Sequence, residues 1–436
     1  MRQTVAITLL TIGTLCAHAG HTVIEDTITG SSVYPGTVHT LKITVPDAYS
    51  PQTPAALYLG LDGILCNAPA VLDSLMAVGD IPVTIGVFLQ PGVVYAPDGT
   101  VLRYNRSNEF DATDNRFATF LATEVLPIVE TITTNDGRPI RFSADPRDRT
   151  IFGLSSGGIA AFVAAWHRPD LFGKVFSGCG TFVPMRGGND LEAIVRKHEP
   201  LPLRIFLQDG FSDTWNPLFG SWYEHNRLLA SALDFAGYDC AFDWAEGGHS
   251  VRRATEILPN VLKWLWSSDH DKRPTSNDLL QPLLAEDSGW EAIDPNRCQQ
   301  FASARAVYPD GSLAAVPQSG TNYINQEIID SEGNSIYSQP FYWLHSYDNG
   351  ALNINSMAYD GDGNLWVLTR AGIQICDQNG RVRGILRLPL DLDAENGKIS
   401  INDGVVYIID NKDCYARCIR VTAPVNGSRP ASQGQG

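Results

Sequence analysis

A run of residues whose types and spacing could perform nucleophilic chemistry lies at 153–157, where the sequence reads Gly-Leu-Ser-Ser-Gly. The apolar residues 150–152 precede it, and a helical pattern follows at 157–167. A G-x-S-x-G pattern between a strand and a helix is typical of a nucleophile elbow, whose small neighbours permit a strained serine backbone. The hydroxyl then lies at a helix N-terminus, where the helix dipole and free amides favour negative charge. We therefore expect Ser155 to act as a nucleophile.

A serine hydroxyl needs a base to become a strong nucleophile, and a carboxylate commonly orients that base. After an elbow of this kind the chain order is serine, acid, histidine. His249 follows the expected strand at 240–244 in a glycine-rich loop and is the candidate base. The acid should follow the expected strand at 203–208, where Asp209 and Asp213 are both candidates. We favour Asp213 because it lies further out on the loop, while Asp209 adjoins the strand end and suits a role in the turn.

A negatively charged tetrahedral intermediate requires two amide donors. The amide of Ser156, directly after the nucleophile, is the first candidate. The second should come from the loop after an early strand, and we expect it to be the amide of Ile64, which follows the apolar run 56–61. The alternative is that Asp62 and Gly63 in this loop form only a turn.

The elements that must hold these residues alternate along the chain from 38 to about 270. Alternating strands and helices predict a mostly parallel sheet with helices on both faces, an α/β class fold. Strand candidates are 38–45, 56–61, 82–89, 150–154, 174–177, 203–208 and 240–244, and helix candidates are 115–130, 157–167, 221–236 and 251–266.

The pattern changes after a polar, proline-containing stretch near 269–288. Short β-like runs with Asp-Gly and Asn-Gly turns follow, and their spacing is typical of a β-propeller or a related repeat. We therefore expect a signal peptide at 1–19, an α/β-hydrolase domain at 20–268, a linker at 269–287, an all-β partial propeller-like domain at 288–424 and a disordered tail at 425–436.

Composition excludes several classes of function. The 436 residues carry 32 Lys and Arg against 48 Asp and Glu, a net charge of −16, which disfavours non-specific binding to nucleic acid or anionic lipid. After residue 20 no apolar run approaches the length of a membrane span. Residues 1–19 combine Arg2, an apolar stretch and an A-x-A site, the pattern of a secretory signal, so we expect a secreted or periplasmic protein.

The cysteines and histidines give no sign of a metal site. Without Cys16 the eight cysteines become seven, so at least one thiol is free. Cys414 and Cys418 are close enough in the sequence to form a disulfide across a tight turn. No Cys/His cluster has the spacing of a zinc site, and we expect neither a metal nor an organic cofactor.

Five runs occur in this order: LGLDGILCNAP, NRSNEFDATDNRFATFLATEVLP, FGLSSGGIAAFVAAWHRPDLFGKVFSGCG, PLRIFLQDGFSDTWN and WAEGGHS. Together they resemble the Putative esterase family of α/β-hydrolases, which holds enterochelin esterases, esterase D, feruloyl and acetylxylan esterases and mycolyltransferases. The resemblance covers about residues 55–270. It implies Ser155 as nucleophile, Asp213 rather than Asp209 as acid and His249 as base. It also implies the amides of Ile64 and Ser156 as the oxyanion donors.

The same resemblance suggests residues that border the substrate. Residues 106–111 are similar to the family's segment beside the pocket, which nominates Arg106 and Glu109. The Arg-Gly-Gly run at 186–188 resembles a loop over the site, which nominates Arg186. Trp215 follows the acid and could stack on a sugar or an aromatic acid; core packing is the alternative role for it.

Residues 302–420 are similar to parts of the gluconolactonase and senescence-marker-protein propeller family, on the residues 356–367 and 372–382. About 120 residues make roughly three blades, fewer than a closed propeller needs. The family's metal-binding aspartate has Asn355 at its position, a weaker ligand for a hard cation. This segment is therefore expected to pack on the first domain, to bind glycan or to form a homodimer.

The interpretation that joins these observations is an exported serine carboxylesterase acting on acetyl or feruloyl esters of a polysaccharide, with no nucleic-acid or membrane partner. One alternative is hydrolysis of an enterochelin-type siderophore, a multiply charged iron complex. The expected pocket offers few cations for it: Arg103, Arg106, Arg186 and Arg252. The other alternative is a gluconolactonase-like or glycan-binding protein that works through its C-terminal segment.

Overall fold

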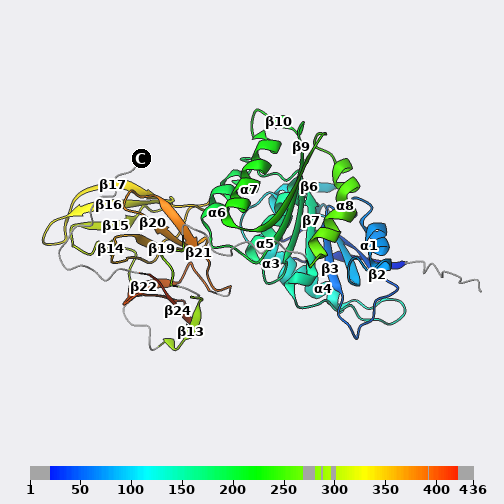
Figure 1. The fold of residues 1–436 in the computed structure, drawn as a ribbon, viewed down its shortest axis with the longest axis horizontal. Helices are drawn as coiled ribbons and strands as arrows, with labels where there is room; N and C mark the ends of the chain where they lie inside the picture. The colour runs from blue at the N-terminus through cyan, green and yellow to red at the C-terminus, as the bar shows by residue number, and fades with distance from the viewer. Residues whose placement is uncertain (1–19, 269–279, 286–287, 296–300, 391, 421–436) are drawn as a thin grey trace, which may run out of the picture.

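The computed structural model describes residues 20–268, 280–285, 288–295, 301–390 and 392–420. Its two bodies lie side by side along the long axis of the molecule (Figure 1). One is built from a twisted sheet with helices, and the other from strands alone. The expected signal peptide, the expected tail and most of the expected linker lie outside the described residues.

The first body is built on an eight-stranded sheet with the order β1-β2-β4-β3-β7-β8-β9-β12. Strands β1 and β2 pair antiparallel, β2 pairs antiparallel with β4, and the other pairings are parallel. The inner strands are fully buried apolar runs, as a parallel sheet covered on both faces requires. Their bounds are β1 His21–Ile28, β2 His39–Pro46, β3 Ala56–Leu61, β4 Thr84–Leu89, β7 Arg149–Leu154, β8 Lys174–Gly178, β9 Arg204–Gly210 and β12 Asp239–Ala245.

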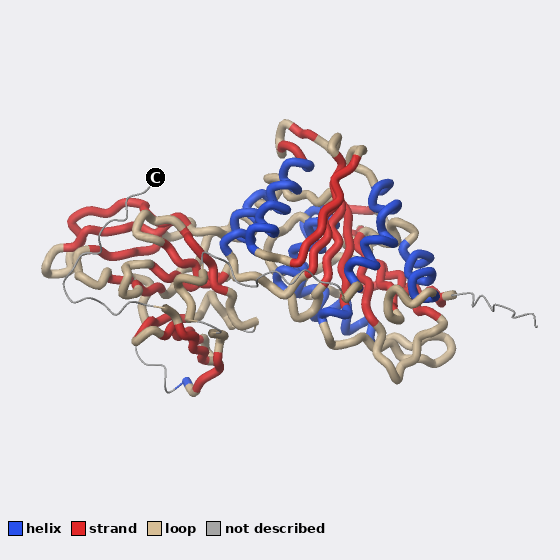
Figure 2. Tube along the Cα trace, viewed as in Figure 1, coloured by secondary structure: helices blue, strands red, loops and turns tan. Residues whose placement is uncertain are grey.

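Helices cover both faces of this sheet (Figures 1 and 2). Helices α1 (Ala68–Ala77) and α8 (Val251–Trp266) pack on one face, where α8 buries an apolar stripe at helical spacing. The opposite face is covered by α3 (Arg116–Phe120), α4 (Leu126–Thr131), α5 (Ser156–His167) and α7 (Trp222–Ala236). None of the helices in the described residues is long and apolar enough to cross a membrane. The α/β-hydrolase-like architecture expected from the sequence is confirmed.

The second body consists of three four-stranded antiparallel sheets. Their orders are β13-β24-β23-β22, β14-β15-β16-β17 and β18-β19-β20-β21. The strands are β13 Glu291–Ile293, β14 Ala306–Val307, β15 Leu313–Pro317, β16 Tyr323–Ile329, β17 Ser335–Trp343, β18 Met357–Tyr359, β19 Leu365–Thr369, β20 Gly372–Cys376, β21 Val382–Leu386, β22 Lys398–Asn402, β23 Val405–Ile409 and β24 Cys414–Cys418. An all-β region of antiparallel sheets is therefore present, and its kinship with the propeller family stays a prediction.

The hairpin turns of this body explain the glycine pattern of the sequence. In three of them an aspartate Oδ1, that of Asp330, Asp360 or Asp377, accepts the backbone N–H groups two and four residues later. The residue three after each aspartate is a glycine with φ between +80° and +84°. That conformation strains any residue with a Cβ, so the aspartate and the glycine are both required by the turn.

The proposed pairing of Cys414 with Cys418 is wrong. Cys414 is disulfide-bonded, whereas Cys418 is a free thiol. Both residues belong to strand β24, where a separation of four residues places their Cα atoms about 13 Å apart. A disulfide needs Cα atoms within about 7 Å, so no tight turn brings the two together.

The two bodies are joined by direct polar contacts. Glu199, after α6 (Leu191–Lys197), accepts from Arg417 Nη2 at 2.7 Å and from Nη1 at 2.9 Å. Trp166 Nε1 donates to Tyr347 Oη at 2.8 Å, in the interior of the interface. Beside this pair, Asp348 accepts from Arg186 Nη2 at 2.7 Å and from its Nε at 3.1 Å. The strand-only body is thus anchored on the helical face of the α/β body.

We predict that Glu199→Gln lowers the free energy of unfolding by about 2 kcal/mol, because it leaves the Arg417 guanidinium without its counter-charge. The Arg417 side chain is only 6% exposed, so water cannot replace the lost carboxylate. A chemical denaturation curve measures the change. The control is Glu291→Gln at an exposed position of β13, which should leave the curve in place.

Candidate active site

The three residues expected to form a catalytic group meet at one edge of the sheet. Ser155 follows β7, Asp213 follows β9 and His249 follows β12. Ser155 Oγ lies 2.8 Å from His249 Nε2, and His249 Nδ1 lies 2.8 Å from Asp213 Oδ1 and 3.1 Å from its Oδ2. The carboxyl ends of parallel strands share one edge, which is where α/β folds bind their ligands. The three side chains are thus in direct contact, in the order that the predicted nucleophile, base and orienting carboxylate require.

The backbone at Ser155 has φ 58° and ψ −123°, a conformation that L-residues rarely adopt. The flanking glycines allow this turn. A Cβ at Gly153 would lie 2.1 Å from the carbonyl oxygen of Gly157, and a Cβ at Gly157 would lie 2.9 Å from Asp62 Oδ2. The sharp turn places the hydroxyl at the N-terminus of α5, as the G-x-S-x-G pattern predicts.

The loop after β3 supplies the second expected oxyanion donor. The amide of Gly63 is bonded to Leu89 O at 3.0 Å, while among the described residues no backbone acceptor is bonded to the amide of Ile64. The amide of Ser156, at the first residue of α5, is likewise without a backbone acceptor in the described part of the chain. Both donors therefore remain available to a substrate oxygen.

Arg106 holds this loop in place. Its Nε and Nη2 lie 2.6 and 2.8 Å from the two carboxylate oxygens of Asp62, a two-pronged ion pair. The hydrogen bonds that Arg106 donates to Asp62 raise the pKa of the guanidinium. Asp62 itself has φ 62°, a conformation that needs external support in a residue with a Cβ. Arg106, expected to contact substrate, is thus found to bind the loop that carries Ile64.

We predict that Arg106→Met lowers kcat about 10- to 100-fold with little change in KM, because the Ile64 amide would lose its fixed position. Steady-state kinetics on a p-nitrophenyl ester measure the effect. The matched control is Arg147→Met in the exposed turn before β7, where another ion pair between an arginine and an aspartate is lost; it should leave kcat within about twofold. Equal losses in both variants would contradict the role given to Arg106.

Glu109 does not border the substrate, contrary to expectation. Its carboxylate is fully buried and accepts from His39 Nε2 at 3.0 Å, Gly92 N at 3.0 Å and Asn105 Nδ2 at 2.7 Å. These bonds join β2, the loop after β4 and the start of α2 (Arg106–Phe110). A buried carboxylate is tolerated only with such partners, so Glu109 has a structural role.

The other two residues expected to bind substrate lie at the rim. Arg186 forms an ion pair with Asp348 and also donates from Nη1 to Asn108 Oδ1 at 3.2 Å. Trp215, on the short hairpin strand β10 (Trp215–Asn216), is 70% exposed, which excludes core packing as its role. Trp215 remains a candidate for substrate contact, and Arg186 contacts the second body.

Two residues around the nucleophile were not anticipated in these roles. Thr181 Oγ1 lies 3.4 Å from Ser155 Oγ and receives a hydrogen bond from Trp222 Nε1 at 3.3 Å. The Trp222 ring also packs edge-on against the His249 ring, with centroids 6.0 Å apart. Thr181 follows β8, the strand next to β7 in the sheet. Because loops that follow neighbouring parallel strands lie at the same edge, this position could have indicated that Thr181 lies near Ser155.

Among the described residues, one group of His, Cys, Asp or Glu side chains has ligand atoms close enough to share a metal ion: Cys179, Asp213 and His249, within 4.8 Å. Two of these residues already bond to one another. Burial raises the pKa of the Cys179 thiol, and a protonated thiol is a poor metal ligand.

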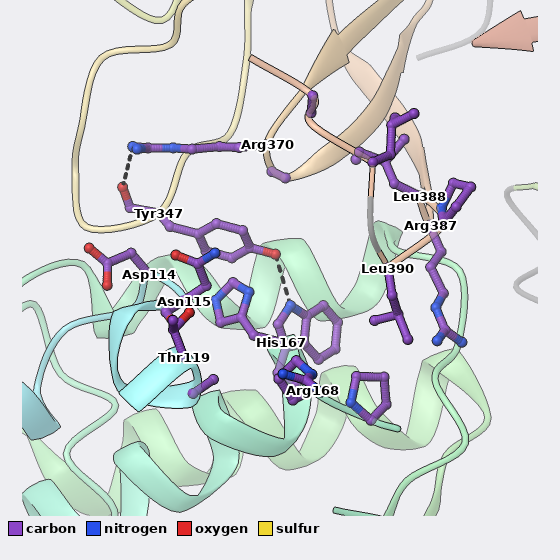
Figure 3. Close-up of a pocket in the computed structure, with 18 of the residues that line it drawn as sticks. Asp114, Asn115, Thr119, His167, Arg168, Tyr347, Arg370, Arg387, Leu388 and Leu390 are labelled. Carbon is purple, nitrogen blue, oxygen red and sulfur yellow. Dashed lines mark hydrogen bonds between the residues drawn. The ribbon is translucent and has the colours of Figure 1, made fainter. Parts of the chain in front are cut away.

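A cleft of about 820 Å³ lies between the two bodies. Figure 3 shows His167 and Arg168 of the α5 end on one side and Arg370, Arg387 and Leu388 on the other. Because α5 has 12 residues, His167 is about 18 Å along the helix from the end that carries Ser155. The cleft is therefore separate from the group around the nucleophile.

A family model described as "Putative esterase" matches residues 32–271, more than half of the chain. The chain belongs to this esterase family. The match contains Ser155, Asp213 and His249 and ends before the strand-only body, so it does not bear on the propeller resemblance. No curated protein matches the sequence.

Solved structures of esterases are similar to the α/β body. A ferulic acid esterase is 18% identical with a TM-score of 0.42, over 57% of this chain and 98% of its own. The enterobactin esterase FES from Shigella flexneri is 22% identical with a TM-score of 0.44, over 56% of this chain and 58% of its own. FphF, a serine hydrolase from Staphylococcus aureus, is 13% identical with a TM-score of 0.40, over 57% of this chain and 100% of its own.

Proposed function

We propose that this esterase is an exported serine hydrolase that removes acetyl or feruloyl groups from a polysaccharide. The observation that carries the mechanism is the unbroken pair of 2.8 Å contacts from Ser155 through His249 to Asp213. A strained serine in contact with a histidine that a buried carboxylate orients is the arrangement of nucleophilic acyl transfer.

In the proposed reaction, His249 Nε2 takes the Ser155 proton as Oγ attacks the ester carbonyl. Asp213 accepts from Nδ1–H, which fixes the imidazole tautomer and stabilises the imidazolium that forms. The amides of Ser156 and Ile64 donate to the oxyanion. The imidazolium then protonates the leaving alcohol. Water, activated by the same histidine, attacks the acyl-enzyme, releases the acid and restores the Ser155 hydroxyl.

Two hairpins at the catalytic edge support a polysaccharide as the substrate. The hairpin β5–β6 (β5 Val93–Tyr95, β6 Val101–Tyr104) follows β4, and β10–β11 (β11 Gly220–Ser221) follows β9. They carry aromatic side chains with large exposed fractions: Tyr104 75%, Trp215 70% and Tyr95 45%. Exposed aromatic rings at the rim of a site are suited to stacking on sugar rings or on an aromatic acid.

The charges near the site favour a glycan over a multiply anionic siderophore. Arg106 is paired with Asp62, Arg186 with Asp348 and Arg252 with Glu256. Of the cations expected near the pocket, Arg103 alone has no ion pair within the described residues. An anionic iron complex would have to compete with these carboxylates, whereas a neutral sugar chain would not.

The test compares initial rates on acetylated xylan, feruloylated arabinoxylan, iron-loaded enterobactin and p-nitrophenyl acetate. De-esterified polysaccharide is the blank. Faster turnover of a polysaccharide ester than of enterobactin supports the substrate class, and the reverse order rejects it. Absence of turnover on all four substrates rejects the esterase mechanism. Activity that a chelator abolishes would favour the metal-dependent lactonase alternative.

A further inference from the structure

We propose that Asp209 is a positioning residue that, as a neutral acid, donates a hydrogen bond to the Asp213 carboxylate and fixes its orientation toward His249. This inference rests on the proposed serine mechanism. It extends the catalytic group by one residue beyond the three that the family pattern implies. It also gives Asp209 a role other than that of a simple turn residue.

The two carboxyl groups lie together in the interior of the protein. Asp209, the second-to-last residue of β9, is fully buried, and the Asp213 side chain is fully buried as well. Their side chains are hydrogen-bonded to each other. An ionised carboxylate can only accept hydrogen bonds, so a bond between two carboxyl groups requires a proton on one of them.

The surroundings decide which of the two carries the proton. Asp213 accepts from His249 Nδ1 and from the Thr214 amide, and it must be negative to stabilise an imidazolium. Asp209 accepts from Gly210 N at 2.7 Å and from Asn226 Nδ2 at 2.9 Å. Both of these donors are neutral, so among the described residues no cation compensates a charge on Asp209. The proton therefore belongs to Asp209.

The electrostatics agree with this placement. Burial and then the hydrogen bond and charge of Asp213 raise the pKa of Asp209 to about 9. The hydrogen bonds from His249 and Asp209 outweigh burial and lower the pKa of Asp213. The other titratable groups that face Asp209 are His249, beyond Asp213, and the Cys179 thiol, whose pKa burial raises.

This bond gives Asp213 a third donor, besides His249 Nδ1 and the Thr214 amide. Asn226, on α7, anchors Asp209 in turn, and its Nδ2 also reaches Gly180 O at 2.8 Å. The orientation of Asp213 is thereby tied to β9, α7 and the loop after β8. When Asp209 ionises at alkaline pH, the donor is lost and two carboxylates repel each other, which should displace Asp213 from His249.

The experiment measures kcat and KM on p-nitrophenyl acetate from pH 6 to 10.5 for the wild type, Asp209→Asn and Asp209→Ala. The wild type should lose activity with an apparent pKa near 9. Asp209→Asn keeps a donor that cannot ionise, so kcat at pH 7 should stay within about fivefold and the alkaline loss should disappear. Asp209→Ala removes the donor, so kcat should fall about 10- to 100-fold with KM nearly unchanged.

Asp403→Asn, in the exposed turn between β22 and β23 of the second body, controls for removal of a carboxylate, and thermal unfolding of each variant controls for a change in fold. An alkaline loss that persists unchanged in Asp209→Asn would overturn the proposal. So would a kcat of Asp209→Ala equal to that of the wild type. Ser155→Ala distinguishes failure of the serine mechanism from failure of the role given to Asp209. Full activity in Ser155→Ala rejects the serine mechanism itself. If Ser155→Ala is inactive and the Asp209 variants behave like the wild type, only the role of Asp209 is rejected.

Discussion

Replacement of Ser155 by alanine should lower kcat on p-nitrophenyl acetate by about 10⁴-fold or more. The hydroxyl is the group that His249 Nε2 contacts at 2.8 Å. The backbone amides of Ser156 and Ile64 remain in the variant, so the residual rate should reflect oxyanion binding alone.

The neighbouring serine provides the control for this measurement. Ser156→Ala keeps its backbone amide and removes a hydroxyl that bonds to Asp111, so kcat should fall by no more than about tenfold. Mass spectrometry after treatment with a fluorophosphonate should find the label on Ser155 in the wild type. Equal activity losses in the two variants, or a label on Ser156, would contradict the assignment of the nucleophile.

The second large effect is expected for Asp213→Asn, with a fall in kcat of about 10⁴-fold at neutral pH. The amide would donate to His249 Nδ1, so the imidazole proton would move to Nε2, the nitrogen that must accept from Ser155. The positions of the three side chains can stay the same in Asp213→Asn while the tautomer of His249 is wrong. The loss of kcat would then not come from a loss of packing.

The pH dependence of kcat distinguishes a wrong tautomer of His249 from misfolding of the variant. Because its hydrogen bonds hold the pKa of Asp213 below its usual value despite burial, the wild type should keep an ionised Asp213 throughout the neutral range. Asp403→Asn, in the second body, should leave the profile unchanged. An Asp213→Asn variant with more than about a tenth of wild-type kcat at pH 7 would show that Asp213 does not set the tautomer.

The sequence predicts most of the α/β body because its strands are continuous apolar runs and its helices have one apolar stripe. The strand expected at 56–61 is β3 with the same bounds, and the helix expected at 251–266 is α8. Strand β1 was missed because its sequence, HTVIEDTI, shows neither a regular polar–apolar alternation nor a continuous apolar run, and it lies at an edge of the sheet. Short hairpins such as β10–β11 have too few residues to show a hydrophobic periodicity.

The site shows the same division between local and long-range information. Ser155 could be located because the elbow is encoded within five adjacent residues. Glu109 could not, since the partners that bury it, His39 and Gly92, come from segments 70 and 17 residues away. Likewise, a local view of Asp209 shows only a turn residue, because its contact with Asp213 and Asn226 depends on how three elements pack.

The unusual backbone of Ser155 has a consequence for the stability of the whole protein. A residue with a Cβ at φ 58° and ψ −123° costs on the order of 1–3 kcal/mol, which a glycine would not. A Ser155→Gly variant, which lacks the proposed nucleophile, is therefore expected to be more stable than the natural protein. Screens that select variants for heat resistance alone would reward loss of the hydroxyl, so any such selection must be coupled to turnover.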